Sequence, residues 1–329
     1  MKKVLVLGSN SFSGAAFAAH LLQLGDIQVI GASRSPELHD LFLPYRWQPS
    51  GNFSFEQIDI NHDLSRLVEL MHAEKPECVV NFAAQSMVAE SWQNPGDWFM
   101  TNTVSTVRLH DELRKMPFLH RYVHISTPEV YGSCSGGVTE THPFNPSTPY
   151  AVSRAAMDMS LRTFHAAYGF PVVTTRAANV FGAGQQLYRI IPRTILFILL
   201  GRKLQLHGGG YSTRSFIHIS DVVAATWQIA CSGRIGEVYH ITTDRTISIR
   251  ALVEIICQRL GVNFKDCVDS IGERQGKDAA YHLDGSKLRR ELNWVDRVSL
   301  EQGIEDCIAW VSTNLDTLRH LPFDYRHKP

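Results

Sequence analysis

The stretch VLVLGSNSFSG, residues 4–14, decides the fold that we predict from the sequence. Its four leading apolar residues indicate a buried strand, and the turn from Gly8 to Gly14 leads into a helix. A glycine-rich turn in this setting points backbone N–H groups and the positive helix end at a diphosphate, although such a turn can also join a strand to a helix without any ligand. We therefore predict that Gly8, Ser11, Phe12 and Gly14 bind a dinucleotide. Ser11 stands where a middle glycine is usual, and it fits if its φ is negative.

Short apolar runs alternate with helical patterns through the first half of the chain. The runs are almost continuously apolar, which is typical of parallel strands that are covered on both faces. The predicted strands are residues 4–7, 27–32, 53–59, 78–83, 121–126 and 171–176, and the predicted helices are residues 15–24, 64–74, 98–115 and 148–168. This order predicts an α/β fold with a doubly wound parallel sheet of the Rossmann type.

The regular alternation stops after Asn179, which indicates a second, smaller α/β lobe. An insertion follows, one strand-then-helix unit returns, and the chain beyond residue 247 is rich in helical patterns. We predict a dinucleotide-binding domain from residues 1–178 plus 214–246, and a substrate-binding lobe from residues 179–213 plus 247–329. The cleft between the two is the expected site.

Composition excludes several classes of function. Lys and Arg number 32 and Asp and Glu also number 32, so the chain has no basic field for nucleic acid or an anionic membrane. The six cysteines lack C-x-x-C spacing and the histidines lack H-E-x-x-H spacing, so we predict no metal site. The first residues do not resemble a signal peptide, and the apolar stretch at residues 195–200 falls far short of the roughly 20 residues of a membrane span. A cytoplasmic protein is expected.

The second predicted strand ends in Ser33 and Arg34, without the acidic residue that binds the ribose 2′-hydroxyl of NAD+. An Arg at this point favours a 2′-phosphate, so we predict NADP+ in preference to NAD+, although Arg34 could equally stack on adenine from a solvated loop. The ends of the third and fourth strands supply the remaining predicted cofactor contacts, which are Asp59, Ile60, Ala83 and Ala84.

Four residues near the fifth strand form a candidate catalytic set. The segment HISTPEVYG, residues 124–132, places Thr127 and Glu129 at the edge of the cleft, and Tyr150 and Arg154 follow on the next predicted helix. Because they are four residues apart, Tyr150 and Arg154 share a helix face. A Tyr beside a cation can take a proton from a sugar hydroxyl while the cofactor oxidises the same carbon. By itself, a Y-x-x-x-R pattern more often reflects a core Tyr near a surface Arg than a catalytic pair. Here the position of the two residues after the strand favours the catalytic interpretation.

Arg154 stands where a Lys is expected in such a pair. Free Tyr has a pKa near ~10, so a Tyr that acts near neutral pH needs its pKa lowered by about 3, which corresponds to roughly 4 kcal/mol. One positive charge at ~4 Å in an effective dielectric of ~20 supplies about that much. We therefore expect Arg154 to meet the electrostatic demand on Tyr150, and to bind the cofactor together with it. A guanidinium does not release a proton, so Arg154 cannot relay one to solvent.

These motifs together resemble the extended short-chain dehydrogenase/reductase family, the NAD(P)-dependent nucleotide-sugar epimerases and dehydratases. ISTPEVYG and NPSTPYAVSRAAMD are similar to the family's active-site segments, and RAANVFGAGQ and STRSFIHISDVVAA to its diphosphate-binding segments. ERQGKDAAYHLDGSKLRRELNW, residues 273–294, is similar to the C-terminal signature of the sugar 4,6-dehydratases. The resemblance implies that the smaller lobe holds a nucleotide sugar. The implied substrate-binding residues are Gln85, Ser86, Asn179, Arg189, Arg214 and Arg274. Each Arg could instead form a surface ion pair, and Asn179 a turn.

Within this family, Glu129 favours a 4,6-dehydratase, because epimerases generally lack a carboxylate at that place. Pro128 departs from the Thr-Asp-Glu of the dTDP-glucose branch, while GDP-mannose dehydratases also lack that Asp, so we expect GDP-mannose or GDP-N-acetylglucosamine as substrate. The cofactor would be tightly bound and recycled. A 4-epimerase, a uronic acid decarboxylase and a non-catalytic NADP-binding sensor are the alternatives. The resemblance also implies a homodimer or larger oligomer that pairs the helices predicted at residues 98–115 and 148–168.

Overall fold

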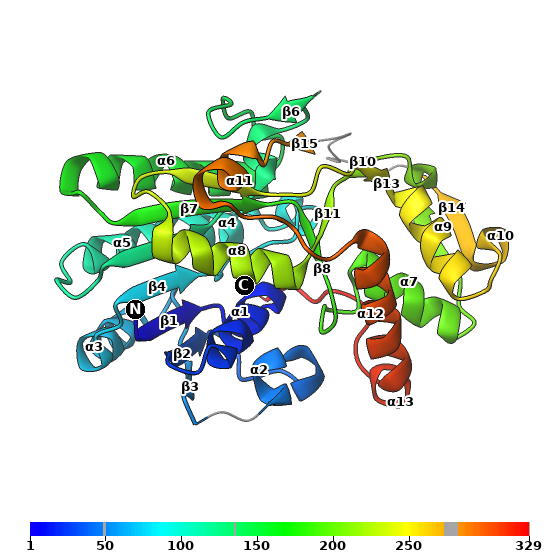
Figure 1. Ribbon diagram of the computed structural model, residues 1–329, viewed down its shortest axis with the longest axis horizontal. Coiled ribbons are helices and arrows are strands. Elements are labelled where there is room, and N and C mark those ends of the chain that lie inside the picture. The colour runs from blue at the N-terminus through cyan, green and yellow to red at the C-terminus, as the bar shows by residue number, and fades with distance from the viewer. Residues whose placement is uncertain (49–50, 135, 273–281, 329) are drawn as a thin grey trace.

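The apolar run after Lys2 forms β1 (Lys3–Leu7), which lies inside a sheet of seven parallel strands (Figure 1). The structure is a computed structural model that describes residues 1–48, 51–134, 136–272 and 282–328. The strand order is β12-β7-β5-β4-β1-β2-β3, so the direction in which the chain adds strands to the sheet reverses between β1 and β4. The other strands of the sheet are β2 (Gln28–Ser33), β3 (Phe53–Gln57), β4 (Cys78–Asn81), β5 (Arg121–Ile125), β7 (Val172–Ala177) and β12 (Val238–Ile241).

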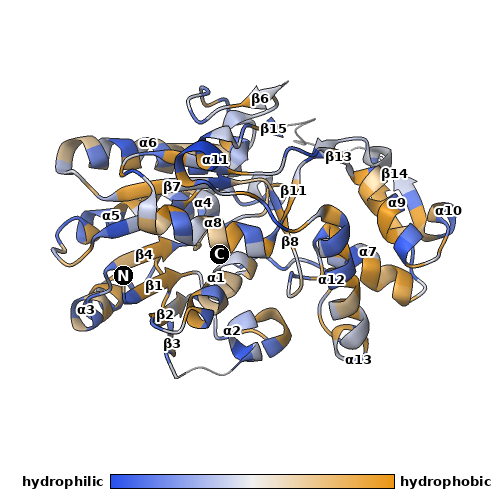
Figure 2. Cartoon of the chain, viewed as in Figure 1, coloured by the Kyte–Doolittle hydropathy of each residue, from blue (hydrophilic) through white to orange (hydrophobic). Residues whose placement is uncertain are grey.

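Alternate residues of β1 enter two separate apolar cores. Val4 and Val6 pack in a cluster with α1 (Phe12–Gln23) and α8 (Ile219–Ser232), whereas Leu5 and Leu7 pack in a cluster with helices of the other face. Those helices are α3 (Leu64–Glu74), α5 (Thr106–Leu113) and α6 (Pro149–Tyr168). Burial on both faces explains the continuous apolar runs, and Figure 2 shows the central strands in the hydrophobic colour. The predicted doubly wound α/β fold is confirmed.

One predicted helix is broken. The chain at residues 98–115 forms α4 (Pro95–Phe99), a π-helical segment (Met100–Ser105) and α5 in succession. Side-chain bonds accompany the widened turns: the Thr106 hydroxyl donates to the Thr101 carbonyl at 2.8 Å, and the Asn102 amide donates to the Ser153 hydroxyl at 3.0 Å. No Pro or Gly interrupts residues 98–115, so the sequence carried no breaker signal here.

The smaller lobe has its own apolar core, built mainly from α7 (Ile190–Leu199), α9 (Ile249–Arg259) and α12 (Leu300–Thr313). Figure 1 shows these helices gathered to the right of the sheet. This separation of cores supports the two-lobe division that we propose. The remaining helices are α2 (Pro44–Trp47), α10 (Phe264–Cys267), α11 (Ser286–Leu292) and α13 (Leu315–Leu318).

Short strand pairs lie outside the main sheet, some within the smaller lobe and some between it and the sheet domain. They are β8 (Asn179–Phe181) with β11 (Phe216–His218), β10 (Thr213–Arg214) with β13 (Ile247–Ser248), β9 (Leu204–His207) with β14 (Val268–Ile271), and β6 (Gly137–Val138) with β15 (His282–Leu283). Single 3-10 turns occur at Asp40–Phe42, Glu90–Trp92, Pro128–Tyr131 and Gly208–Gly210. Among the described residues, no helix has the length and apolar character needed to cross a bilayer, and no group of His, Cys, Asp and Glu could hold a metal ion.

Candidate active site

A cavity of about 1270 Å³ lies at the carboxyl ends of β1, β2, β4, β5 and β7 and extends to the smaller lobe. The switch in strand order between β1 and β4 places it where ligands bind in doubly wound sheets. Most of the residues that we predicted for the site line this cavity. They are Gly8, Ser11, Phe12, Ser33, Arg34, Asp59, Ile60, Ala83, Ala84, Gln85, Ser86, Thr127, Glu129, Tyr150, Arg154, Asn179, Arg189 and Arg214. Gly14 does not line it, and Arg274 lies outside the described residues.

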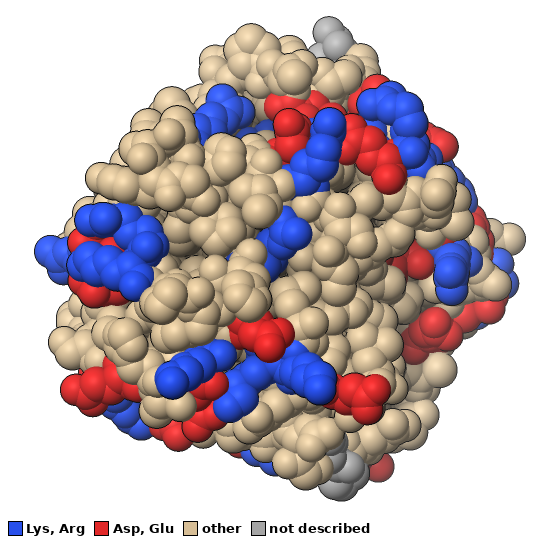
Figure 3. Space-filling view, turned by 60° about the vertical axis from the view of Figure 1, so that its left-hand side comes forward, with Lys and Arg blue, Asp and Glu red and all other residues tan. Residues whose placement is uncertain are grey.

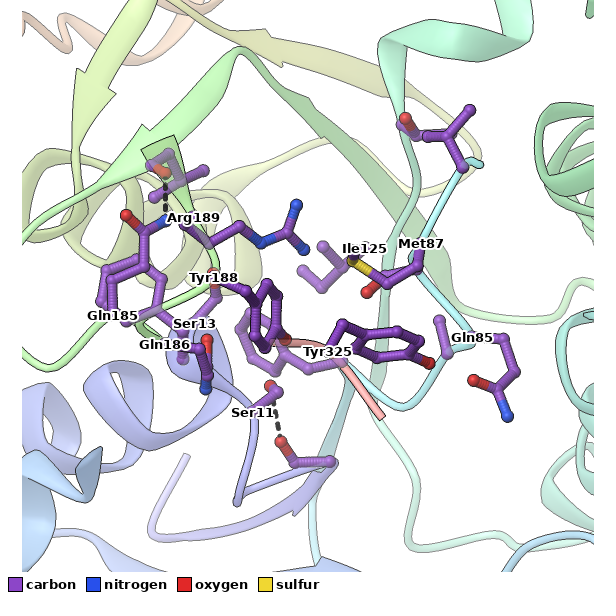
Figure 4. Close-up of a pocket in the computed structure, with 18 of the residues that line it drawn as sticks. Ser11, Ser13, Gln85, Met87, Ile125, Gln185, Gln186, Tyr188, Arg189 and Tyr325 are labelled. Carbon is purple, nitrogen blue, oxygen red and sulfur yellow. Dashed lines mark hydrogen bonds between the residues drawn. The ribbon is translucent and has the colours of Figure 1, made fainter. Parts of the chain in front are cut away.

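The glycine-rich turn is held in a tight conformation by its own side chains. Gly8 has φ +78°, and a Cβ there would lie 2.6 Å from the Ala83 amide nitrogen. Ser11 has φ −74° and begins α1: its hydroxyl donates to the Gly8 carbonyl at 2.7 Å and accepts from the Gly14 amide at 3.1 Å (Figure 4). The negative φ that Ser11 requires is therefore present. Because its hydroxyl bonds within the turn, Ser11 stabilises the helix start, and the positive end of α1 is left facing the cavity.

The end of β2 has the polar groups that a cofactor ribose would meet. The Ser33 hydroxyl accepts from the backbone N–H of Asn10 at 3.0 Å, and this bond connects β2 to the glycine-rich turn. The Arg34 guanidinium donates to the Lys328 carbonyl at 3.0 Å, so a residue from the far end of the chain reaches this edge of the cavity. A helix N-terminus, a cation and an elongated cavity together fit a dinucleotide.

Two capped turns bring the candidate catalytic residues to one wall. Thr127 begins the 3-10 turn Pro128–Tyr131, where its hydroxyl accepts from the Glu129 amide at 3.3 Å. Thr148 begins α6, where its hydroxyl accepts from the Ala151 amide at 3.1 Å and so fixes Tyr150 in the first turn. Their roles stay predictions, but the structure places the phenol, the carboxylate and the guanidinium around the same cavity, as the proposed chemistry requires.

The electrostatics of Tyr150 differ from the expectation. Burial raises the pKa of Tyr150 above its usual value, and this outweighs the lowering by Arg154, with Glu129 raising it further and Thr127 and Arg189 lowering it. The ring is 8% exposed, so the loss of solvation acts at nearly full strength. One guanidinium is therefore not sufficient by itself. A further positive charge beside the phenol, which an oxidised nicotinamide would carry, would lower the pKa of Tyr150.

Arg154 points behind Tyr150 toward the end of β5. Its guanidinium donates to the Ile125 carbonyl and lies 3.5 Å from the His124 ring. The side chain is 3% exposed, and its Nε has no hydrogen-bond partner among the described residues. A buried cation that is only partly compensated favours formation of an anion nearby, so Arg154 is suited to stabilising the Tyr150 phenolate.

A buried ion pair supports this wall from beneath. Burial alone would raise the pKa of Asp158, but the Arg176 guanidinium 2.6 Å away, together with His124 and Ser126, holds the pKa of Asp158 well below its usual range. The same carboxylate lies 3.4 Å from His124, which in turn lies beside Arg154. The network therefore fixes the end of β5, which precedes Thr127 and supplies the Ile125 carbonyl that Arg154 contacts.

The lobe side of the cavity carries the predicted diphosphate ligands. Arg189 precedes α7 and lies 5.4 Å above the Tyr188 ring, and Figure 4 shows its side chain directed toward Ile125. Arg214 lies in β10 and donates to the Thr213 carbonyl at 2.7 Å, while Asn179 begins β8. Gln85 lies instead on the sheet-domain side, after β4; it is 3% exposed and donates to the Lys328 carbonyl at 2.7 Å. The cations thus stand on the wall opposite the glycine-rich turn.

The sequence analysis missed a third group of cavity residues, which comes from the C-terminal segment. Tyr325, Arg326 and Lys328 line the cavity, and the Tyr325 ring lies 5.5 Å from the Tyr188 ring. The signal was the pattern FDYRH at residues 323–327, in which aromatic and charged side chains alternate. That alternation predicts an extended segment with one face against the protein.

Comparison with known proteins identifies the family. A family model described as GDP-mannose 4,6 dehydratase matches residues 5–307. The dTDP-glucose 4,6-dehydratase of Haemophilus influenzae is 30% identical over 95% of this chain and 99% of its own. The crystal structure of DesIV, a dTDP-glucose 4,6-dehydratase from Streptomyces venezuelae with NAD bound, is 30% identical with a TM-score of 0.88 and covers 95% of this chain and 98% of its own. A UDP-glucuronic acid 4-epimerase structure from Bacillus cereus is 25% identical, with a TM-score of 0.86 over 94% and 99% of the two chains.

Proposed function

The chain belongs to the family described as GDP-mannose 4,6 dehydratase, and from this membership we propose that it removes water from an NDP-hexose to give the NDP-4-keto-6-deoxy sugar. That the enzyme is a nucleotide-sugar 4,6-dehydratase, and thus a lyase, follows from its relatives. The observation that carries the proposal is the position of Glu129, which lines the same cavity as Tyr150.

Tyr150 and Thr127 act on the C4 hydroxyl of the sugar. A nicotinamide dinucleotide, held at the glycine-rich turn and the end of β2, would supply the redox chemistry as acceptor of a hydride from C4 and donor of that hydride to C6. Tyr150 accepts the hydroxyl proton as the C4 ketone forms, and Thr127, whose hydrogen bond lowers the pKa of Tyr150, holds the phenol. Arg154 stabilises the phenolate through its charge. Because no proton leaves Arg154 and the product keeps its C4 ketone, Tyr150 must lose the proton to solvent by another route before the next cycle.

Glu129 performs the elimination. The C4 ketone makes the C5 proton acidic, so the carboxylate can remove it while the C5–C6 double bond forms and the C6–O bond breaks. The departing hydroxide needs a proton, and Pro128 has none to give, so Glu129 passes on the proton that it took from C5. Water leaves, and Glu129, reprotonated from solvent, donates a proton to C5 as C6 would receive the hydride. An epimerase removes no water from the sugar, so it needs no carboxylate at this position.

For the nucleotide, we propose a GDP-linked hexose, either GDP-mannose or GDP-N-acetylglucosamine. Pro128 and the family description support this choice. The named relatives support a second candidate, dTDP-glucose, since they are 30% identical over almost their whole length.

Mass spectrometry of products from a panel of GDP-, dTDP- and UDP-hexoses tests both proposals. A dehydratase yields a product lighter by one water, and in D2O that product carries deuterium at C5 because the proton that Glu129 donates to C5 comes from solvent. Tyr150→Phe should lower turnover by about 10²–10⁴-fold through loss of the proton acceptor. An unchanged mass with inversion at C4 identifies an epimerase, and loss of carbon dioxide from a uronic acid identifies a decarboxylase. A protein that binds dinucleotide and acts on no sugar is the non-catalytic sensor.

For the cofactor, we propose NADP+ as the preferred dinucleotide, on the strength of Arg34 at the end of β2. The related crystal structures hold NAD, so the direct comparison is fluorescence titration with NADPH and NADH. Arg34→Ala should weaken NADPH binding by about tenfold or more, the equivalent of ~1.4 kcal/mol, and leave NADH binding almost unchanged. Equal affinities in the intact protein would overturn the preference.

We further propose a homodimer formed through the α4–α5 and α6 region. Four apolar side chains on these helices are exposed, namely Met100, Val104, Val152 and Met159. The spacing within each pair, i and i+4 or i and i+7, puts its members on one face of the helix.

A further inference from the structure

The C-terminal segment crosses the cavity and touches both of its walls. After α13 the chain returns to the sheet domain, where Lys328 contacts Arg34 at the end of β2 and Gln85 beyond the end of β4. On the lobe side, Arg193 donates to the Phe323 carbonyl and the Asp324 carboxylate, each at 3.0 Å, and the Phe323 ring lies 6.1 Å from the Phe197 ring. We call residues 323–328 the C-terminal strap.

The far end of the C-terminal strap is anchored on the sheet domain. The His327 ring stacks on Trp98 at 4.8 Å with an interplanar angle of 15°, and its Nε2 lies 2.7 Å from the Asp97 carboxylate. The Lys328 carbonyl accepts from Gln85 at 2.7 Å and from Arg34 at 3.0 Å. Contacts of this number and kind fix an extended segment that has no secondary structure of its own.

The C-terminal strap forms a wall of the cavity without filling it. With the strap in place, the cavity still reaches from the glycine-rich turn to Tyr150, and Tyr325, Arg326 and Lys328 stand on its surface. Figure 4 shows the Tyr325 and Tyr188 rings together in the pocket, near Ser11. Half-buried aromatic residues at 323, 325 and 327 alternate with exposed residues at 324, 326 and 328.

The chemistry of the C-terminal strap suits an anionic, aromatic ligand. Its cations Arg326 and Lys328 line the same cavity as Arg34, and Lys328 contacts Arg34 and Ser35 at the β2 end, where the adenosine half of a dinucleotide binds in this type of sheet. Its Tyr325 offers a ring to the same space. A dehydratase gives its hydride back within each cycle, so the cofactor has no need to leave between turnovers.

We propose that the C-terminal strap is a third wall of the dinucleotide site, which contacts the cofactor and slows its dissociation. The inference rests on the proposed function for the identity of the ligand as NAD(P). It assigns to Tyr325, Arg326 and the His327 anchor a role in holding the cofactor, and none in the chemical steps.

Dissociation of the reduced dinucleotide tests the strap without any sugar. Protein loaded with NADPH, and separately with NADH, is mixed with excess oxidised dinucleotide, and the loss of bound fluorescence gives the off-rate. His327→Ala should raise the off-rate at least tenfold, and removal of residues 322–329 should raise it further. His320→Ala, the same change at an exposed position before the strap, is the matched control and should leave it unchanged.

A double-mutant cycle separates the anchor from a general loss of structure. Asp97→Ala should reproduce most of the effect of His327→Ala, and the double variant should release the dinucleotide no faster than His327→Ala alone. An unchanged off-rate in both His327→Ala and the truncated chain would overturn the proposal. Tighter binding after truncation would also overturn it, because the strap would then compete with the cofactor. If the loaded protein retains its dinucleotide but converts no sugar, the proposed function is wrong and the proposal for the C-terminal strap still stands.

Discussion

At the scale of single residues, Arg154 decides how Tyr150 becomes a base. Burial raises the pKa of Tyr150 and Arg154 opposes this, so removal of the charge must raise that pKa further. With Arg154→Met we expect the rising limb of kcat/KM against pH to move to higher pH, and each pH unit that the limb moves should lower kcat/KM at neutral pH about tenfold. Arg154→Lys keeps the charge and should keep the limb in place. The same limb in Arg154→Met and the intact enzyme would show that the cation does not act on the phenol.

His110 is a buried residue that lowers stability in acid. It is fully buried among Tyr122, Phe164 and Phe170, and neither ring nitrogen has a hydrogen-bond partner among the described residues. Burial, followed by the nearby His124, holds the pKa of His110 well below its usual value. The unfolded chain therefore binds one more proton than the native state as pH falls below about 6.5, and the free energy of unfolding falls by ~1.4 kcal/mol per pH unit from this residue.

The variant His110→Phe should remove that contribution. Because it also removes two unpaired polar atoms, we expect its free energy of unfolding near neutral pH to be no lower than that of the intact protein. Urea unfolding at several pH values between about 6.5 and 5 measures the slope, which should be smaller in the variant. His120→Phe, at an exposed position, is the control and should leave the slope as it is. Identical slopes in His110→Phe and the intact protein would contradict the assignment.

Sequence patterns located most of the candidate site but not its electrostatic balance. Glu129 and Tyr150 could be placed because each follows a recognisable strand end or helix start. The pKa of Tyr150 could not be foreseen, because it depends on how deeply α6 seats the ring. Tyr325 and Lys328 were missed for a similar reason: they lie far along the chain from the turn that they approach, and only tertiary folding brings them there.

At the scale of elements, the start of α6 links stability to catalysis. The Thr148 hydroxyl caps the helix two residues before Tyr150, and Thr148 is 2% exposed. Thr148→Ala should lower the free energy of unfolding by about 1 kcal/mol and also lower kcat, since the first turn then frays around the phenol. Ser299→Ala removes the corresponding cap of α12, where the Ser299 hydroxyl accepts from the backbone N–H of Gln302 at 3.2 Å. It should cost similar stability with kcat unchanged, and equal kcat values in the two variants would contradict the link.

The elements themselves were largely predictable where one physical rule dominates. Strands buried on both faces gave continuous apolar runs, and α3 was predicted with its observed bounds, Leu64–Glu74. The seventh strand, β12, was missed because it lies beyond Asn179, where the regular alternation of strands and helices stops and no further strand of the sheet is expected. The π-helical segment at Met100–Ser105 was missed because a hydrogen bond from Asn102 to Ser153 of α6 accompanies it, and that bond depends on a partner in another part of the fold.

At the scale of the whole molecule, one face is suited to a second copy of the chain. Figure 3 turns the left side of Figure 1 forward and shows broad areas of uncharged residues between clusters of charged ones. Met100 and Val104 are 44% and 38% exposed, and Val152 and Met159 are 39% and 51% exposed, on helices that pack side by side. Two such helix pairs related by a two-fold axis would bury all four side chains in a four-helix bundle.

A charge placed in that bundle should separate the two copies. Val104→Glu and Met159→Glu each put a carboxylate into the apolar face that the bundle would bury, so the double variant should elute as a monomer when its mass is measured by light scattering. Ile235→Glu, at an exposed apolar residue after α8, is the matched control and should keep the mass of the intact protein. The double variant should also lose activity, because Asn102 of the π-helical segment bonds both Gln85 of the cavity and Ser153 of α6. A dimeric double variant would place the interface elsewhere, and a fully active monomer would show that the cavity does not depend on it.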